Sequence, residues 1–232
     1  MTQPQAAKGF NARWESDVYA EGRQMNRYPF PCYIGPFFGH FGRVADRKSV
    51  EVLEIGCGAG NNIWFFAREG FSIHGIEGSA SALAYARKRL DSEELKADLR
   101  EGDFQHLPYG DASMDFVLDR GSITHNRRAV VEATLDEARR VLKPGGLFYS
   151  QMFTTGHTDL QFGTALGDGS AEVFTEGYFA GIGLTFFASR ADIDTLFGSR
   201  FELLSVEIES LENVLTGHKS TVWNVLGRKN GA

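Results

Sequence analysis

The sequence of 232 residues is short of cysteine and proline and has no long apolar run, and each shortage excludes a class of protein. Cys32 and Cys57 cannot form a disulfide framework and offer no paired metal-ligand spacing, so we expect reduced thiols in a cytoplasmic protein. No run approaches the ~18 apolar residues of a membrane span. The first residues, MTQPQAAKGF, do not show a signal-peptide pattern, and we expect no membrane association.

An excess of basic residues is missing too, since the net charge is −6. An extended nucleic-acid surface needs a positive field, so we expect no nucleic-acid partner. Charged residues at 23% and aromatic residues at 12% exclude a disordered chain. Glycine is abundant, at 27 residues, which indicates many tight turns or sites lined by backbone. The length fits one domain over residues 1–232.

The first 48 residues lack a regular pattern, and we expect them to form a helical and aromatic cap. Residues 10–28 are typical of a short amphipathic helix. Residues 29–42 hold three of the six prolines and five aromatic residues, which predicts an ordered apolar loop and no regular helix.

From residue 50 onward, strand and helix patterns alternate, which predicts an α/β fold with a doubly wound, mostly parallel sheet. The expected strands are 50–55, 71–76, 97–100, 115–118 and 147–150, and the expected helices are 61–69, one capped by Ser79, and 127–142. Residues 154–183 are glycine-rich and predict a loop insertion on the substrate side. A helix capped by Ser189 and Asp192 follows, and residues 201–209 and 221–227 predict two closing strands.

The strongest chemical signal is a glycine-rich turn at residues 56–60, between the first strand and its helix. Glycines allow a ligand to approach bare backbone at a helix N-terminus. Glu77 ends the next strand, where a carboxylate can bind both hydroxyls of a ribose. A dinucleotide fingerprint needs a glycine at the sixth place of the turn, but Asn61 stands there. Glu54, two residues before the first glycine, favours a cationic ligand.

Four segments in order resemble the class I S-adenosylmethionine-dependent methyltransferases. They are LEIGCGAG at 53–60, GIEGS at 75–79, GDF at 102–104 with LPY at 107–109, and VLKPGG at 141–146. The resemblance covers nearly half of the chain. It implies a seven-stranded sheet of order 3-2-1-4-5-7-6 with strand 7 antiparallel, and S-adenosylmethionine as cofactor, with S-adenosylhomocysteine as product.

The resemblance also implies which residues bind the cofactor. Residues around Glu54 would shape the pocket for its methionine part, Glu77 would bind the ribose, and Asp103 would accept from the adenine amino group. The segment before the first strand would fold over the cofactor. The complete set is Tyr28, Glu54, Gly56, Cys57, Gly58, Gly60, Asn61, Glu77, Gly78, Ser79, Asp103, Phe104, Asp119, Arg120 and Ser122.

His125 follows the fourth strand, where cofactor and acceptor meet in this family, and it is our candidate general base. The alternative is a histidine that caps the helix beginning at Arg127 or faces solvent. We expect no metal site. The aromatic residues at 30–41 either cover an acceptor or pack beneath the N-terminal helix, and the arginines between 13 and 47 either attract an anion or face solvent.

The sequence thus predicts a methyltransferase for a small-molecule acceptor, anionic or aromatic, acting as a monomer or homodimer. Methylation of RNA or protein, binding of S-adenosylmethionine without catalysis, and nicotinamide-dependent oxidoreduction remain as alternatives.

Overall fold

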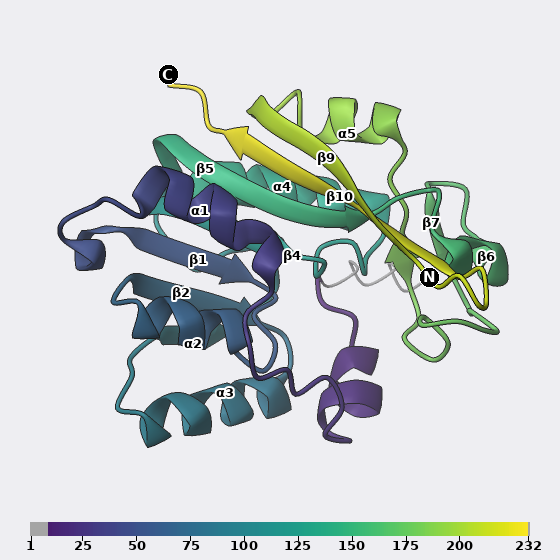
Figure 1. Ribbon diagram of the computed structural model, residues 1–232, viewed down its shortest axis with the longest axis horizontal. Helices are drawn as coiled ribbons and strands as arrows, with labels where there is room; N and C mark the ends of the chain where they lie inside the picture. Colours follow the sequence, from purple (N-terminus) through teal and green to yellow (C-terminus); the bar gives the residue numbers. More distant parts are fainter. Residues whose placement is uncertain (1–8, 232) are drawn as a thin grey trace, which may run out of the picture.

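The computed structural model describes residues 9–231, and a seven-stranded sheet forms its centre (Figure 1). The strands are β1 (Glu51–Ile55), β2 (Ser72–Glu77), β3 (Asp98–Glu101), β4 (Met114–Arg120), β5 (Leu142–Phe153), β9 (Glu202–Glu212) and β10 (Lys219–Arg228). Their order is β3-β2-β1-β4-β5-β10-β9, and β10 runs antiparallel to both of its neighbours. The predicted fold class and strand order are therefore confirmed.

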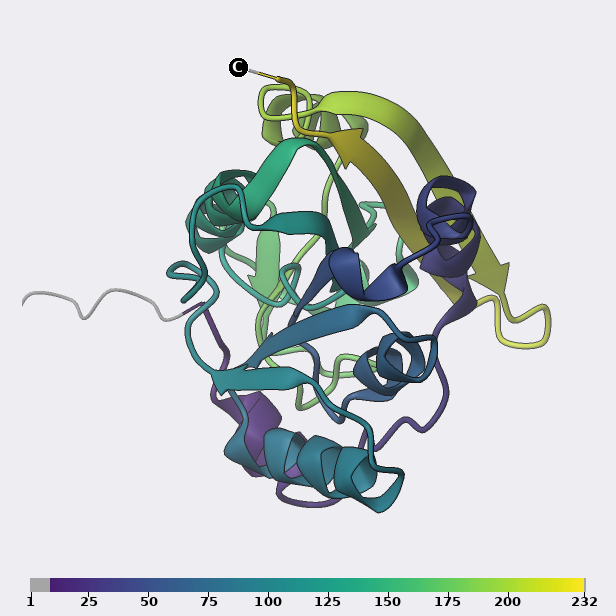
Figure 2. The same cartoon turned by 90° about the vertical axis from the view of Figure 1, so that its left-hand side faces the viewer.

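Five α-helices cover the two faces of this sheet (Figure 2). They are α1 (Ile34–Phe41), α2 (Asn61–Arg68), α3 (Ala80–Ser92), α4 (Arg128–Val141) and α5 (Arg190–Leu196). Helices α1 to α3 contribute to one apolar core, and α4 and α5 contribute to the other. Strand β1 is buried almost throughout because it is central and covered on both sides, which explains its nearly continuous apolar sequence.

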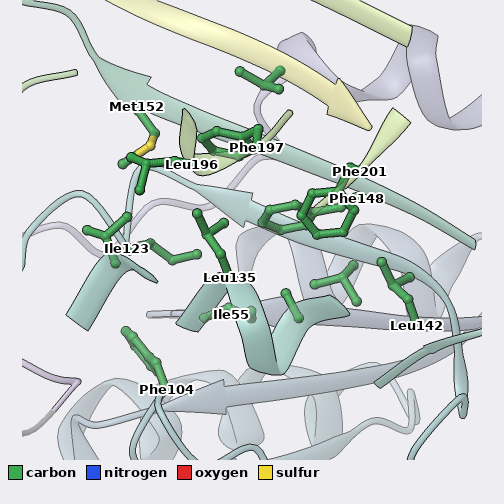
Figure 3. Packing of buried hydrophobic residues seen from close by; sticks show 14 of the residues in the cluster. Ile55, Phe104, Ile123, Leu135, Leu142, Phe148, Met152, Leu196, Phe197 and Phe201 are labelled. Carbon is green, nitrogen blue, oxygen red and sulfur yellow. The ribbon is translucent and has the colours of Figure 1, made fainter. Parts of the chain in front are cut away.

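The core on the α4 and α5 side is aromatic near the C-terminal helix. The ring of Phe148 in β5 packs against Phe201, with ring centroids 5.3 Å apart, and against Phe197 at 6.1 Å (Figure 3). Leu135 of α4 and Ile193 of α5 are fully buried in the same cluster. This packing fixes β5 and β10, whose ends form one side of the candidate site.

The prediction of a loop without a helix at residues 29–42 is wrong. Residues Pro31–Tyr33 form a 3-10 turn that leads directly into α1. Pro36 lies in the first turn of α1, where a backbone N–H has no acceptor within the helix, so the proline costs no hydrogen bond. The helix is held by Phe37, which is fully buried and contacts the rings of Phe66, at 4.7 Å, and Phe116, at 5.0 Å.

Local capping signals specify the two other helix starts that the sequence indicated. The Ser79 hydroxyl accepts from the backbone N–H of Ala82 at 3.0 Å and begins α3. Ser189 and Asp192 form a reciprocal capping box at the start of α5. In residues 10–28, by contrast, the helix is confined to a short π-helical stretch, Trp14–Tyr19.

The segment 154–183 contains more regular structure than the predicted loop. A 3-10 helix spans Thr158–Phe162, and β6 (Thr164–Ala165) and β7 (Ser170–Glu172) form a small antiparallel sheet with β8 (Thr185–Phe186). Figure 1 shows the hairpin of β9 and β10 running past the other strands toward this segment. No helix within residues 9–231 is long and apolar enough to cross a membrane. Most of the N-terminal segment used for the signal-peptide expectation lies outside the described residues.

Candidate active site

A cavity of about 400 Å³ lies at the carboxyl ends of the central strands. One side, here called the glycine-loop side, is formed by Glu54, residues 56–59 and Glu77. The opposite side, the hairpin side, is formed by residues of β4, β5, β10 and β9, namely Arg120, Gln151, Phe153, Glu209, Leu211, Ser220 and Val222. Adjacent strands are about 4.8 Å apart, so the strands that supply the two sides span roughly 20 Å from β1 to β9, with β4 of the hairpin side directly next to β1. The volume lies within the range of small-molecule pockets.

Two glycines of the loop occupy positions that no other residue would fill without strain. Gly56 has φ +70°, and a Cβ there would come within 2.2 Å of the Ser122 Cβ. Gly58 has φ +50°, and a Cβ there would lie 2.5 Å from the Tyr19 hydroxyl oxygen. The loop backbone is therefore enclosed between the turn after β4 and the N-terminal segment.

Glu54 is a buried carboxylate with one oxygen unsatisfied. Its Oε1 accepts from the Asn62 amide at 2.6 Å, whereas its Oε2 is buried without a hydrogen-bond partner among residues 9–231. Burial raises the pKa of Glu54 to about 8. A buried carboxyl oxygen that lacks a partner, in a residue that lines a cavity, is suited to a cationic or hydrogen-bond-donating ligand.

Glu77 organises the backbone of the site. Its carboxylate accepts from the N–H groups of Gly58 at 2.8 Å, Gly78 at 2.8 Å and Ser79 at 3.0 Å. It lines the cavity although it is only 3% exposed, and burial raises its pKa. A carboxylate offers about four acceptor positions, so capacity for a further donor remains.

Several residues of the predicted cofactor set lie outside the cavity wall. Asp119 is fully buried beneath the turn after β4, where it accepts from the N–H groups of Ser122 and Ile123 and from the Ser150 hydroxyl. Asp103 accepts through Oδ1 from the N–H groups of Gly9 and Gln105. The side chain of Tyr28 is 72% exposed, and only its carbonyl contributes, by accepting from Asn61.

Of the other predicted cofactor-binding residues, some line the cavity and some only hold the glycine loop in place. Gly60, Gly78 and Ser79 support the loop from outside the cavity wall. The predicted residues that do line the cavity are Glu54, Gly56, Cys57, Gly58, Asn61, Glu77, Phe104, Arg120 and Ser122.

His125, the candidate base, lies in the wall between the two sides and is buried. Its Nδ1 lies 3.1 Å from the Thr185 hydroxyl, and its ring contacts Trp14 at 5.0 Å and Phe153 at 5.7 Å. Burial lowers the pKa of His125 to about 4, so the imidazole is neutral at pH 7 and a weaker base than an exposed histidine. The solvent-facing interpretation is therefore wrong.

The sequence did not reveal most of the hairpin side. Gln151, Glu209, Leu211 and Val222 carry no recognisable motif, and only the alternation of residues along a strand could have indicated their shared face. Of the aromatic residues at 30–41, only Phe30 lines the cavity, and Tyr33 and Phe37 belong to the core.

A second polar cluster, which the sequence did not indicate, lies next to Phe153 and Phe179, two aromatic residues that line the cavity. His157, Asp159 and His218 bring one ligand-type atom each within 4.8 Å of one another. The groups already satisfy each other, because Asp159 accepts from His218 Nε2 at 2.6 Å and from the Phe179 N–H at 3.0 Å, and His157 Nδ1 accepts from the Asp159 N–H at 3.1 Å. The cluster fixes Phe179, which lines the cavity.

Comparison with known proteins places this geometry in a family. Residues 52–146 match the model of a methyltransferase domain. A fatty-acid O-methyltransferase of Mycolicibacterium smegmatis is 30% identical over 131 residues, which cover 56% of this chain and 44% of the relative. A ubiquinone biosynthesis O-methyltransferase of Maricaulis maris is 32% identical over 111 residues, which cover 47% of this chain and 43% of the relative. The chain thus spans less than half of these curated relatives.

Two solved structures share the fold. A methyltransferase of Methanosarcina mazei superposes with a TM-score of 0.68 at 24% identity, covering 80% of this chain and 94% of that one. The 1,6-didemethyltoxoflavin-N1-methyltransferase of Burkholderia thailandensis, solved with its acceptor and S-adenosylhomocysteine, gives a TM-score of 0.67 at 18% identity and covers 100% of this chain and 94% of that one. The methyltransferase domain matched over residues 52–146, the curated relatives and the shared fold together support a class I S-adenosylmethionine-dependent methyltransferase. S-adenosylmethionine is the cofactor of this family.

Proposed function

We propose that this protein transfers a methyl group from S-adenosylmethionine to an oxygen, nitrogen or carbon atom of a small-molecule acceptor. The observation that carries the proposal is the buried Oε2 of Glu54, which has no partner within residues 9–231 and belongs to a carboxylate on the cavity wall. The cofactor carries two positive charges, on its sulfonium and its amino group, and would supply an activated methyl group. A carboxylate in this position compensates such a ligand.

The residues of the glycine-loop side divide the binding between them. Glu54 would hold the amino group of the methionine part, and Gly56 and Gly58 leave space for it against bare backbone. Glu77 would accept from a ribose hydroxyl with the acceptor position that its three backbone contacts leave unused. Phe104 provides an apolar surface for the base. The Oδ2 of Asp103, which receives no hydrogen bond from residues 9–231, would accept from the adenine amino group.

The remaining residues would prepare the acceptor. Three aromatic residues of the cavity wall would keep water out of the space between the two sides, namely Trp14, Phe153 and Phe179. Exclusion of water strengthens electrostatic interactions in the site. Neutral His125 would accept a proton from a hydroxyl or amine acceptor. Orientation is the larger contribution, since well-oriented reactants reach effective concentrations of about 10⁵–10⁸ M.

Calorimetry with S-adenosylhomocysteine and transfer of a labelled methyl group to a metabolite extract test the proposal. Glu77→Gln should weaken binding of S-adenosylhomocysteine at least tenfold, because hydrogen bonds to a charged group are worth about 1.5–3 kcal/mol each. Glu101→Gln is the matched control, since Glu101 pairs with Glu77 in register but is exposed. Unchanged affinity in Glu77→Gln would refute the ribose assignment, and binding without label transfer would indicate a non-catalytic module.

A further inference from the structure

Arg120 ends β4 on the hairpin side of the cavity and forms no ion pair with residues 9–231. Its guanidinium carbon lies 3.4 Å from the ring centroid of Phe30, and its Nε is buried without a hydrogen bond. Among residues 9–231, no carboxylate lies within ion-pair distance of Arg120. Arg140, for comparison, bonds to both Glu137 and Asp111.

Two acidic residues that act electrostatically on Arg120, Asp119 and Glu209, accept hydrogen bonds from other groups. All three hydrogen bonds to the Asp119 carboxylate come from its own turn and from Ser150. Glu209 accepts from the Asn224 amide at 3.2 Å. Burial lowers the pKa of Arg120, and Cys32, Asp119 and Glu209 oppose this shift. A half-buried cation that no carboxylate contacts directly is costly, and a ligand that supplies a contacting opposite charge would stabilise it.

A row of side chains next to Arg120 adds a hydrogen-bond acceptor to the site. Gln151 is the register partner of Arg120 in β5, and Asn224 is the partner of Gln151 in β10. Asn224 donates to Glu209, and the Gln151 Nε2 donates to the Asn224 Oδ1 at 2.9 Å. This chain of bonds fixes the direction of both amides. It leaves the Gln151 Oε1, which receives no hydrogen bond from residues 9–231, as the atom for a ligand.

Apolar side chains lie around these two groups, together with Glu209 and Ser220. Phe30 and Phe153 contribute rings, and Val222 and Leu211 contribute aliphatic side chains from the hairpin. A flat ring suits such walls, because aromatic side chains pack well against other rings. The same region therefore combines one cation, one acceptor atom and two aromatic surfaces.

We propose that Arg120 and Gln151 form a subsite for a planar acid, whose carboxylate lies against the Arg120 guanidinium and whose neighbouring O–H or N–H donates to the Gln151 Oε1. The proposal rests on the proposed function, because it names the acceptor class of that site. Arginine is suited to this role, since its planar fork binds a carboxylate through two parallel hydrogen bonds.

Matched pairs of planar acids and their neutral amides test the proposal by calorimetry on protein saturated with S-adenosylhomocysteine. The probes are salicylate, anthranilate, 1-hydroxy-2-naphthoate and 3-hydroxy-2-naphthoate, each with its primary amide. At least one acid should bind ten times more tightly than its own amide. Arg120→Gln should remove this preference and Arg120→Lys should retain part of it, because lysine keeps the charge without the fork.

Arg89→Gln is the matched control, because Arg89 also stacks on a ring, that of Trp64 at 4.2 Å, and also has buried unpaired nitrogens, but lies outside the cavity wall. It should leave the preference unchanged. The proposal is overturned if no acid binds more tightly than its amide, or if the preference persists in Arg120→Gln. Failure of the proposed function would be seen separately, as wild-type protein that does not bind S-adenosylhomocysteine.

Discussion

Replacing Glu54 by glutamine should abolish most of the pH dependence of cofactor binding. In the ligand-free protein the Glu54 carboxyl is protonated at neutral pH, because burial raises its pKa to about 8. A cationic ligand in contact with Oε2 favours the ionised form, so binding should release a proton. Glutamine keeps the shape and the contact with Asn62 but cannot titrate.

The magnitude follows from the pKa. With a pKa of about 8, roughly 1% of the sites are ionised at pH 6, about 9% at pH 7 and half at pH 8. If the bound state requires the carboxylate, affinity should rise about ninefold from pH 6 to pH 7 and about fivefold from pH 7 to pH 8. The affinity of Glu54→Gln should be lower at pH 8 and nearly constant over this range.

Glu54 should also make the stability of the ligand-free protein depend on pH. The direction is opposite, because cofactor affinity rises with pH whereas stability falls. Between pH 4.5 and pH 8 the folded protein holds a proton on Glu54 that the unfolded chain has lost, so stability is fully present at low pH and falls as pH rises. Asp119, whose pKa burial raises to about 6, acts in the same direction between pH 3.8 and pH 6. The melting temperature of the ligand-free protein should therefore decrease toward pH 8, and less so in Glu54→Gln.

Calorimetry in buffers of different ionisation enthalpy measures the released proton directly. We expect close to one proton released per S-adenosylmethionine at pH 7 in the wild type and far less in Glu54→Gln. Glu51→Gln is the control, since Glu51 begins the same strand but lies outside the cavity wall. Equal proton release in wild type and Glu54→Gln would refute the reasoning.

Three further substitutions test other parts of the molecule. His125→Gln should lower turnover by about 10²–10⁴-fold with little effect on S-adenosylhomocysteine affinity, and full activity would exclude it as a base. Gly58→Ala should reduce S-adenosylhomocysteine affinity at least tenfold, because the new Cβ would meet the Tyr19 hydroxyl. Gly70→Ala is the control, since Gly70 also has a positive φ but has open space around it. Equal affinity in the two variants would contradict the steric argument. Phe37→Ala should lower the free energy of unfolding by about 3–5 kcal/mol in urea titrations, and a loss below ~1 kcal/mol would show that α1 contributes little to the core.

The alternating strands and helices were predictable because their signals are local. Apolar periodicity identified β1, β2 and β4, and side-chain caps identified the starts of α3 and α5. Helix α1 was missed because a proline within a helix and a proline in its first turn look alike until the helix start is known. That start depends on the burial of Phe37 against α2 and the sheet, which is tertiary information.

The candidate site was predictable on one side only. The glycine loop and Glu77 are continuous in sequence with the strands that present them, so their spacing could be recognised. The hairpin side assembles residues from β4 to β10, separated by up to a hundred positions, through strand register alone. Asp119 shows the opposite problem. Its place in the motif suggested contact with the ligand, but its carboxylate accepts hydrogen bonds from the backbone of the turn that follows it.

The arrangement of the two sides has an evolutionary consequence. The segment that matches the family model, residues 52–146, supplies the glycine-loop side, whereas Gln151, Glu209 and Val222 lie after it in the sequence. Under the proposed function, mutations in the hairpin would change the choice of acceptor and leave the cofactor-binding residues intact. Grafting β9 and β10 between homologues would be a direct route to altered selectivity.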